Sequence, residues 1–588
     1  MRRSLVGRKQ RTDNREPRFA KATQGRQRTE DKLQVGDIQP IRLKKYHLFW
    51  ILAIALSILL AAIMAHDITK PFIELHSWGH AHDAWVARSN VKYGLDYTKG
   101  FDTFAVGYPP PANPTRYLDH PILFTLMNSA AMYVFGINEW SMRLMNIICT
   151  IIAMLLFLKI LRHLVDDVTA LLAGLFFCLF PLIAFFGINM WLYPLVLLAY
   201  WCYLAIIGAL KDVAEKKWHK PVLALSIFLA IQMTWEGFFF AMALGIHYVF
   251  RCIRRKRRPD WVLFSILAVA SFASLALDFI VLAAGENWDF KRLFELAKIR
   301  SGGGELGGSL TWAIWFGRFI EHALTNFSLP VIIAAIFSLT IGQLYAAIKR
   351  NIGRPYSIKF PQFWLFFMPA FFQLTLLRGT LYPHHYWERP MVLFLAIAAA
   401  AAITIIFDML KKYNFAASII VSASITILLC AGCLYGINYY YGIRWQNPED
   451  IKMYKYLNSI IPPDKELLSF EPHIIDQFPG VKAASLRPEI AWYLDRDIVP
   501  AQELTEIVKK TETGKFPYYL MLLPCERFND NANSYLAKLN AELAKRYKLV
   551  KKYPYLPWVE KKAPWMKKED FFIRGMLPQA IYDLTQKP

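Results

Sequence analysis

Long apolar runs separated by short polar segments fill the chain from residue 48 to residue 436. A predominantly apolar helix of this kind can cross the ~30 Å hydrocarbon core of a bilayer. The runs lie at approximately 48–65, 144–161, 168–187, 190–210, 221–236, 238–250, 261–284, 326–347, 360–378, 390–407 and 415–436. The pattern therefore predicts a polytopic α-helical membrane protein with about eleven transmembrane helices.

Two polar regions flank the apolar part. Residues 1–47 are basic and poor in large apolar side chains, which is typical of a disordered cytoplasmic tail. From about 438 the chain changes to amphipathic stretches, the strand-like run YYLMLL at 518–523, and turn signals such as IPPDKE and FPGVK. We therefore expect a tail over 1–47, a transmembrane domain over 48–437 and a soluble α/β domain over 438–588.

A further apolar segment, 121–136, is ambiguous, and the charges of the later loops decide its position. If it crossed the bilayer, the basic loops 251–258 (RCIRRKRR) and 349–354 (KRNIGR) would lie outside, against the positive-inside rule. If it lies along the surface as an interfacial helix, both loops fall on the cytoplasmic side together with the N-terminal tail. We expect the second arrangement, which puts a first outer loop, 66–143, and the C-terminal domain on the extracytoplasmic face.

The composition supports a membrane protein and argues against nucleic-acid binding. Hydrophobic residues make up 55% of the 588 residues, more than a soluble protein of this size can bury. Much of the excess behind the net charge of +23 lies in the N-terminal tail and in short loops, where topology and anionic lipid head groups explain it. The seven cysteines show neither a disulfide framework nor paired metal-ligand spacing. We expect membrane lipids, and no nucleic acid, as partners.

The first outer loop contains a polar segment that begins at Glu74 and reads ELHSWGHAHDAWVARSNVKYGL. Asp83 and Asn90, seven residues apart, share one face of a short amphipathic helix predicted from about residue 80 to residue 92. A carboxylate presented at the membrane surface suits a general base. The alternative is a helix-capping role for Asp83 in the first turn.

Three histidines lie in the same loop. His80 and His82 precede Asp83 in an HxHD pattern, which binds a metal only with a further, distant ligand. No such ligand stands out, so the need for a divalent metal stays open. His120 stands before Pro121 at the start of the interfacial helix, where Pro is ordinary, and a structural role is favoured there.

The later outer loops supply cations. The segment LLRGTLYPHHYWERP, between two spans, contains Arg378, His384, His385 and Arg389. The 285–325 loop surrounds the glycine-rich SGGGELGG with Lys291, Arg292, Lys298, Arg300 and Arg318. Guanidinium groups make bidentate contacts with phosphate, and a glycine-rich loop can close over a ligand. The alternative is membrane anchoring, for which interfacial Arg, Trp and Tyr side chains are common.

Three stretches resemble the GT-C superfamily of polyprenyl-phosphate-sugar-dependent glycosyltransferases, specifically its ArnT/PMT and RgtA/B/C/D-like branch. WGHAHDAWVARSNVKYGL is similar to the first outer loop of that family. YLDHPILFTLMNSAAMYVFGINEWSMRL is similar to its juxtamembrane-helix segment, and HHYWERP to a late outer-loop motif. The resemblance covers roughly residues 48–440. It implies a GT-C-like catalytic domain over 48–437 with juxtamembrane helices on the outer face.

The resemblance also implies the reaction and its residues. A sugar would pass, usually with inversion, from a lipid-phosphate-linked donor to an acceptor hydroxyl outside the cytoplasm, with Asp83 at the position of the catalytic base. A second carboxylate common in the family corresponds to Tyr193 here, so either Glu236 or Glu74 is the candidate second acid or the second acid is absent. The positions that match phosphate or carrier contacts are Arg88, Arg143, Arg378, His384, His385 and Arg389.

This chemistry needs few catalytic groups and no cofactor. A phosphate leaving group, with a second pKa of about 6, departs without a general acid. One carboxylate that takes the acceptor proton and cations that stabilise the phosphate are then sufficient. The acceptor is an envelope glycolipid such as lipopolysaccharide, a glycan or a protein, and we expect the protein in the bacterial inner (plasma) membrane. A protein O-mannosyltransferase is disfavoured because the adjacent Asp-Glu of that family is missing from the first loop.

A lipid or solute transporter is the main alternative. Such a protein would be expected to have more polar side chains at mid-membrane, where Asp278 is the clearest candidate. A non-enzymatic membrane scaffold whose outer domain binds a partner is a second alternative. The Asp and His residues of the first outer loop argue against it.

Overall fold

The computed structural model divides into two compact units, Met1–Ala55 and Leu56–Pro588. In the first unit the described residues, 46–55, are helical. The structure describes residues 46–75, 77–118, 120–186, 192–285, 291–302, 311–345, 363–381, 384–443, 446–470, 475–476, 485–556, 559–560, 572–573 and 576–588.

Six helices within these ranges are long and apolar enough to cross a membrane. They are the helix Tyr46–Asp67, α5 (Glu139–Leu164), α10 (Glu236–Arg255), α11 (Trp261–Gly285), α18 (Met391–Leu410) and α19 (Phe415–Gly442). The helices Trp312–Phe327 (α13) and Leu329–Tyr345 (which contains α14, Leu329–Leu339), bent by 104°, make a seventh if they form one span.

Shorter apolar helices complete the bundle: α6 (Asp167–Leu179), α7 (Pro181–Phe186), α8 (Leu192–Ile206), α9 (His219–Met233) and α16 (Phe363–Leu376). Each of the eleven predicted apolar runs falls on a helix, which confirms the prediction of a polytopic helical protein. By length and composition only six or seven of the described helices qualify as spans, so the count of eleven stays a prediction.

Capping residues explain where several of these helices begin and end. Asn138 accepts a hydrogen bond from the Ser141 amide at 2.9 Å and starts α5, and Asp166 does the same for Thr169 at the start of α6. α10 ends with Arg254 and Arg255, whose charges are favourable beside helix C-terminal carbonyls.

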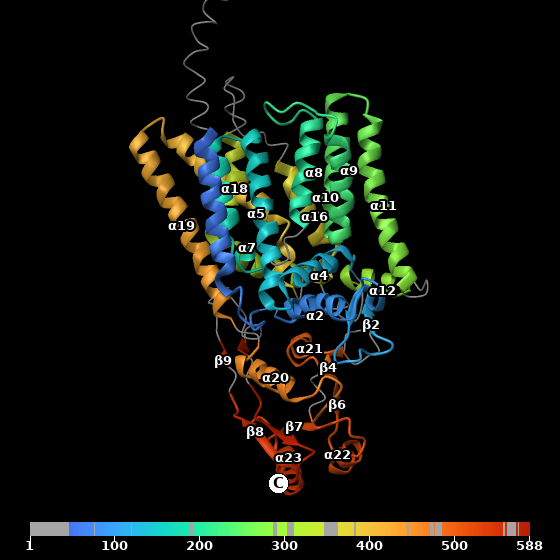
Figure 1. Cartoon of the computed structure of the whole chain (residues 1–588). Helices are drawn as coiled ribbons and strands as arrows, with labels where there is room; N and C mark the ends of the chain where they lie inside the picture. Colours follow the sequence, from blue (N-terminus) through green and yellow to red (C-terminus); the bar gives the residue numbers. More distant parts are fainter. Residues whose placement is uncertain are drawn as a thin grey trace, which may run out of the picture. The chain divides into compact units, whose positions relative to one another are not determined.

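The first outer loop folds into a cap on one end of the bundle. It contains η1 (Ala65–Asp67), α2 (Ser77–Tyr93), α3 (Leu95–Thr98), the antiparallel pair β1 (Asp102–Phe104) and β2 (Thr115–Tyr117), and α4 (Leu123–Phe135). α2 confirms the helix predicted over residues 80–92. With 13 residues, α4 is about 20 Å long, and it is one of the shorter apolar helices that do not qualify as spans by length. α2 packs on α4, and α4 lies across the ends of α5 and α9 (Figure 1).

Short elements from later loops lie next to one another at the bundle. They are α12 (Lys291–Arg300), α17 (Arg378–Leu381) and the 3-10 turn η4 (His385–Glu388). α12 and η4 both contact α17, and η4 also contacts α13 and α16. The fold therefore collects segments that lie far apart in the sequence.

The C-terminal part is the predicted α/β domain. Its mixed sheet has the order β6-β3-β7-β11-β8, with β6, β3 and β7 parallel and β11 antiparallel to both neighbours. The strands are β3 (Leu467–Ser469), β6 (Ile498–Pro500), β7 (Tyr518–Leu522), β8 (Lys548–Tyr553) and β11 (Gln579–Asp583). The helices are α20 (Pro448–Ile460), α21 (Pro488–Leu494), α22 (Leu504–Thr511) and α23 (Asp530–Arg546). Two short ladders join β4 (Ile475–Asp476) to β5 (Ser485–Leu486) and β9 (Val559–Glu560) to β10 (Phe572–Ile573).

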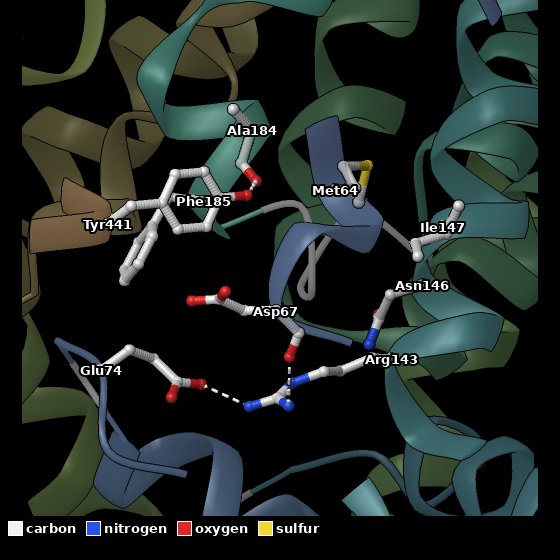
Figure 2. A pocket seen from close by; sticks show the side chains of 9 residues that line it. All are labelled: Met64, Asp67, Glu74, Arg143, Asn146, Ile147, Ala184, Phe185 and Tyr441. Carbon is white, nitrogen blue, oxygen red and sulfur yellow. Dashed lines mark hydrogen bonds and ion pairs between the residues drawn. The ribbon is translucent and has the colours of Figure 1, made fainter. Parts of the chain in front are cut away.

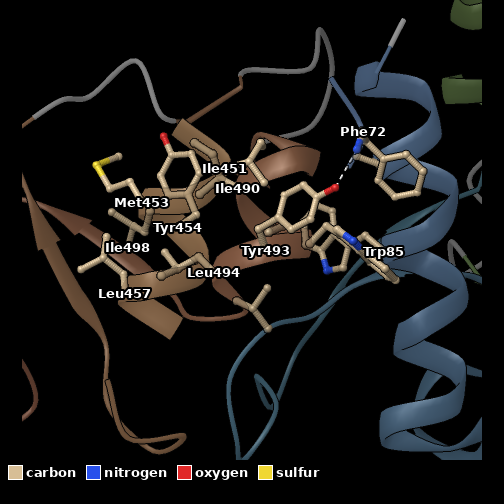
Figure 3. Close-up of a cluster of buried hydrophobic side chains, with 14 of the residues drawn as sticks. Phe72, Trp85, Ile451, Met453, Tyr454, Leu457, Ile490, Tyr493, Leu494 and Ile498 are labelled. Carbon is tan, nitrogen blue, oxygen red and sulfur yellow. Dashed lines mark hydrogen bonds between the residues drawn. The ribbon is translucent and has the colours of Figure 1, made fainter. Parts of the chain in front are cut away.

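The sheet is covered on both faces. Leu520 packs in a cluster with α20 and α21, whereas its neighbours Tyr519 and Met521 pack in another with α22 and α23, as expected for alternating side chains of a strand. The first cluster continues into the cap, where it includes Phe72 and Trp85 (Figure 3). One hydrophobic core therefore joins the cap to the C-terminal domain.

Candidate active site

α2 carries Asp83 at a partly open position on an otherwise buried helix. Along α2 the Trp85 indole donates to the carbonyl of Ala105 at 2.7 Å, and the Asn90 amide donates to Ser129 at 3.0 Å. The Asp83 side chain keeps 19% of its exposure, and its Oδ1 lies 3.2 Å from Nδ1 of His82. Asp83 is therefore held by a firmly anchored helix yet remains accessible.

The late outer-loop motif lies near Asp83 in space. Burial raises the pKa of Tyr386, in η4, to about 12. The positive charges of Arg389 and Arg300 lower this pKa and partly oppose burial. The negative charges of Asp83 and Glu236 raise it further. Charges from the first outer loop, α10, α12 and the segment after α17 therefore all influence this tyrosine.

Glu236 and Arg389 form a buried ion pair in this group. Arg389 Nη2 bonds Oε1 of Glu236, and both side chains are less than a tenth exposed. The Arg389 guanidinium also lies over the Tyr386 ring, 5.1 Å from its centre. Tyr193, at the position where the family carries a carboxylate, interacts electrostatically with the same pair. Of the two candidate second acids, Glu236 is the one beside the site.

Two histidines of the site are held neutral. Burial, with the charges of Arg300 and Arg389, lowers the pKa of His384 to about 4. Burial, with Arg300, His82 and His384, holds the pKa of His120 well below its ordinary value. At neutral pH each ring therefore offers one hydrogen-bond donor and one acceptor without adding charge. The structure thus brings His120, predicted to be structural, into the polar cluster.

Arg300 is a cation that is available to bind a ligand. It ends α12, its side chain is half-buried, and within the described ranges it makes no hydrogen bond or ion pair. It nevertheless acts electrostatically on His120, His384 and Tyr386. Its charge faces the site and is not neutralised by a described carboxylate.

η4 is fixed from behind by a buried polar chain. Asn326 donates to Oε2 of Glu388 at 3.1 Å, and the Tyr440 hydroxyl donates to Oδ1 of Asn326 at 2.7 Å. Burial raises the pKa of Glu388 well above its ordinary value, so the neutral carboxyl form is favoured. This chain ties η4 to α13 and α19 and orients Tyr386 and Arg389.

Arg143 and Glu74, two further candidates, form an anchor within the cap. Arg143 donates to the carbonyls of Asp67, Ile68 and Lys70, and its Nη2 lies 2.8 Å from Oε1 of Glu74 (Figure 2). His80 bonds the same carboxylate at 2.9 Å. The adjoining cavity measures about 40 Å³, room for a water molecule or two rather than a sugar. In the structure, Glu74, His80 and Arg143 are held by contacts with one another and with backbone carbonyls of the cap.

The Glu74 anchor predicts an acid-dependent loss of stability. Burial alone would raise the pKa of Glu74, but Arg143 and the His80 hydrogen bond outweigh burial and hold this pKa far below its ordinary value of 4.5. Such a carboxylate stabilises the fold fully above the unfolded-state pKa, about 4.3, and progressively less as the pH falls towards the folded-state pKa. Below about pH 4 the thermal unfolding midpoint should therefore fall more steeply in wild type than in Glu74→Gln. Parallel pH profiles in detergent would contradict this.

Arg88 and Arg378 are also engaged within the protein. Arg88 donates to the carbonyls of Trp492 and Ala491, at 2.8 and 2.9 Å. Arg378 donates to the carbonyl of Ser301 at 3.2 Å and stacks over Trp312. Of the phosphate-binding candidates, His384 and Arg389 both lie beside Tyr386, on which the charge of Asp83 also acts. The side chain of His385 lies outside the described residues.

Sequence reasoning named Arg300 only as one of several cations of the 285–325 loop, and it did not name Tyr386 as a site residue. Tyr386 lies inside the HHYWERP motif, so its signal was present in the resemblance. Arg300 is the last residue before the glycine-rich segment, a position typical of a ligand-closing loop. In both cases only the fold shows which other loops they face.

Among the described residues, neither metal binding nor transport is supported by a site of its own. Within the described ranges no cluster of three or more His, Cys, Asp or Glu side chains could hold a metal ion. Asp278 accepts a hydrogen bond from Gln232 at 2.8 Å, and Gln232 also binds Ser274. Asp278 therefore joins α11 to α9, a role that helix packing in a membrane explains.

Comparisons with known proteins agree with the fold. Residues 119–278 match a family model described as dolichyl-phosphate-mannose-protein mannosyltransferase. The structure is similar to that of ArnT from Cupriavidus metallidurans bound to undecaprenyl phosphate, with 11% sequence identity, a TM-score of 0.52, and coverage of 92% of this chain and 98% of that chain. No curated protein matches the sequence.

A second solved structure has the same general fold. It is the archaeal oligosaccharyltransferase AglB from Archaeoglobus fulgidus in complex with an inhibitory peptide and a dolichol-phosphate, with 13% identity, a TM-score of 0.50, and coverage of 87% of this chain and 74% of that chain. The family match over residues 119–278 and the shared fold make this chain similar to membrane glycosyltransferases whose names or bound molecules include lipid phosphates.

Proposed function

We propose that this protein transfers a sugar from a polyprenyl-phosphate-linked donor to an acceptor hydroxyl on the extracytoplasmic face of the bacterial inner membrane. One observation carries the proposal: an accessible carboxylate, Asp83, and a cation without a described partner, Arg300, both act electrostatically on Tyr386. The matched family and the ArnT and AglB structures are named with dolichyl or undecaprenyl phosphates, which supports a donor of this class. The eleven-span topology, with the N-terminus cytoplasmic, belongs to the same proposal.

Each residue has a role set by its charge and position. Asp83 takes the proton of the acceptor hydroxyl as the acceptor oxygen attacks the anomeric carbon. The bond from this carbon to the phosphate oxygen breaks with inversion, and its electron pair stays on the phosphate. Arg300 stabilises that phosphate, and the neutral His120 and His384 add hydrogen bonds. Glu236 acts through Arg389, whose position it fixes. No step needs a cofactor.

Replacement of Arg300 tests the phosphate site. Arg300→Gln should weaken binding of undecaprenyl phosphate by roughly tenfold or more, because a charge-assisted hydrogen bond contributes about 1.5–3 kcal/mol. Binding is measured by native mass spectrometry of the purified protein at several salt concentrations. Lys298→Gln, an exposed cation on the same helix, is the matched control and should bind as wild type. Equal affinity in all three proteins would remove Arg300 from the site.

A transporter remains the second candidate from another class. It would move a lipid or solute without forming a glycosylated product and would depend on Asp278 rather than Asp83. Mass spectrometry of envelope glycans from cells with and without the gene separates the two functions. A new or missing sugar on an envelope molecule supports the glycosyltransferase.

A further inference from the structure

The C-terminal domain contacts one side of α2, the helix that carries Asp83. Ser77, Arg88 and Lys92 are spaced so that they share a face of α2, and all three reach residues of α21 or the residue that follows it. Ser77 donates to Glu489 at 3.1 Å near the start of α2, and Lys92 donates to Asp495 at 2.7 Å at its end. α21 therefore holds α2 at both ends.

Arg88 is the centre of this contact. Its two donations to α21 carbonyls are joined by an ion pair with Asp495 at 3.2 Å, and its guanidinium lies 5.3 Å from the centre of the Trp492 ring. The side chain is 5% exposed. Both terminal nitrogens of this buried guanidinium therefore cap C-terminal carbonyls of α21, whereas its buried Nε has no hydrogen-bond partner among the described residues.

Asp83 lies on a different side of α2 from this contact. Five residues along an α-helix turn by about 140°, so Arg88 and Asp83 point in clearly different directions. The hydroxyl of Tyr493 accepts a hydrogen bond from the amide of Phe72 at 2.6 Å, and these rings pack in the core shared by the two parts (Figure 3). α21 thus supports α2 from behind while Asp83 faces the site.

We infer that the C-terminal domain is a working part of the catalytic cap, and that Arg88 is a positioning residue that sets Asp83 through the α2–α21 contact. This inference rests on the proposed function and gives Arg88 a role other than phosphate binding. Displacing a catalytic group by about 1 Å can slow a reaction about a hundredfold, so a small shift of α2 is sufficient.

Two variants test the inference in the full-length protein. Arg88→Met should lower sugar transfer per folded protein by at least about tenfold, because α2 loses the contacts that Arg88 makes with α21. Its affinity for undecaprenyl phosphate should stay within about twofold of wild type, whereas Arg300→Gln loses affinity. Transfer is measured by mass spectrometry of envelope glycans, and affinity by native mass spectrometry with undecaprenyl phosphate as the probe.

Asp495→Asn is the second variant, in case Arg88→Met fails to fold. This substitution lies in the C-terminal domain and leaves both carbonyl contacts of Arg88 in place. It should lower transfer too, but by a smaller factor than Arg88→Met. In the double variant the two effects should not add, since both act on one contact. Loss of undecaprenyl phosphate affinity in Arg88→Met would make Arg88 a phosphate ligand and overturn the inference. Unchanged transfer in both single variants, with Asp83→Asn inactive, would overturn it and leave the proposed function intact.

Discussion

Asp83→Asn should abolish sugar transfer while leaving the folded protein intact. The amide keeps the shape of the carboxylate but cannot take the acceptor proton, and general base catalysis contributes about 10²–10⁴-fold to rate. Among the described residues, the contact at stake is the 3.2 Å approach of Nδ1 of His82 to Oδ1 of Asp83. The Asp83 side chain is also partly exposed, so stability should change little. Transfer is measured by mass spectrometry of envelope glycans in cells that lack the native gene and express the variant.

Asp96, an exposed carboxylate of α3, supplies the matched control. Asp96→Asn makes the same chemical change in the same cap and should transfer sugar as wild type. If Asp83→Asn keeps more than roughly a tenth of the wild-type activity, the substitution has raised the activation free energy by less than about 1.4 kcal/mol. Asp83 would then not be the base.

Arg389→Gln should destabilise the protein strongly as well as reduce transfer. The substitution leaves Glu236, 2% exposed, with a buried charge that has lost its counter-ion. Removing one partner of a buried ion pair typically costs about 3–5 kcal/mol. The expected result is a clearly lower thermal unfolding midpoint and a smaller yield of folded protein in detergent.

A double variant separates the ion pair from other effects. Glu236→Gln together with Arg389→Gln removes both charges, so much of the lost stability should return while transfer stays low. Arg378→Gln, which replaces a half-buried arginine held by one carbonyl and a ring, should lower the midpoint far less. Equal midpoints for Arg389→Gln and Arg378→Gln would show that the Glu236 pair is not a buried charge pair in solution.

The apolar pattern was sufficient to predict the helices, because each run had to satisfy its backbone hydrogen bonds internally in order to enter a membrane. The same holds for α2, where the spacing of Asp83 and Asn90 indicated a helix. The loop charges favoured a surface helix over a span for 121–136; the structure has a 13-residue helix there, and its place relative to the membrane stays a prediction. These predictions depended on local sequence and on length.

The partners of the arginines could not be predicted in this way. Arg88 binds Ala491, 403 residues further along the chain, and no local pattern connects the two. Arg143 likewise caps carbonyls of the turn at 67–70. A guanidinium suits a phosphate and a helix C-terminus equally well, so residue type alone does not separate the two roles. Arg300 differs because the fold brings it to the site without a described carboxylate.

The most direct test of the account is an experimental structure of the full-length protein with undecaprenyl phosphate bound, by cryo-electron microscopy. The account predicts that the phosphate contacts Arg300 beside Tyr386 and His384, on the same face of the cap as Asp83. A phosphate bound instead at Arg88 or Arg143, or at the basic 251–258 loop, would contradict it.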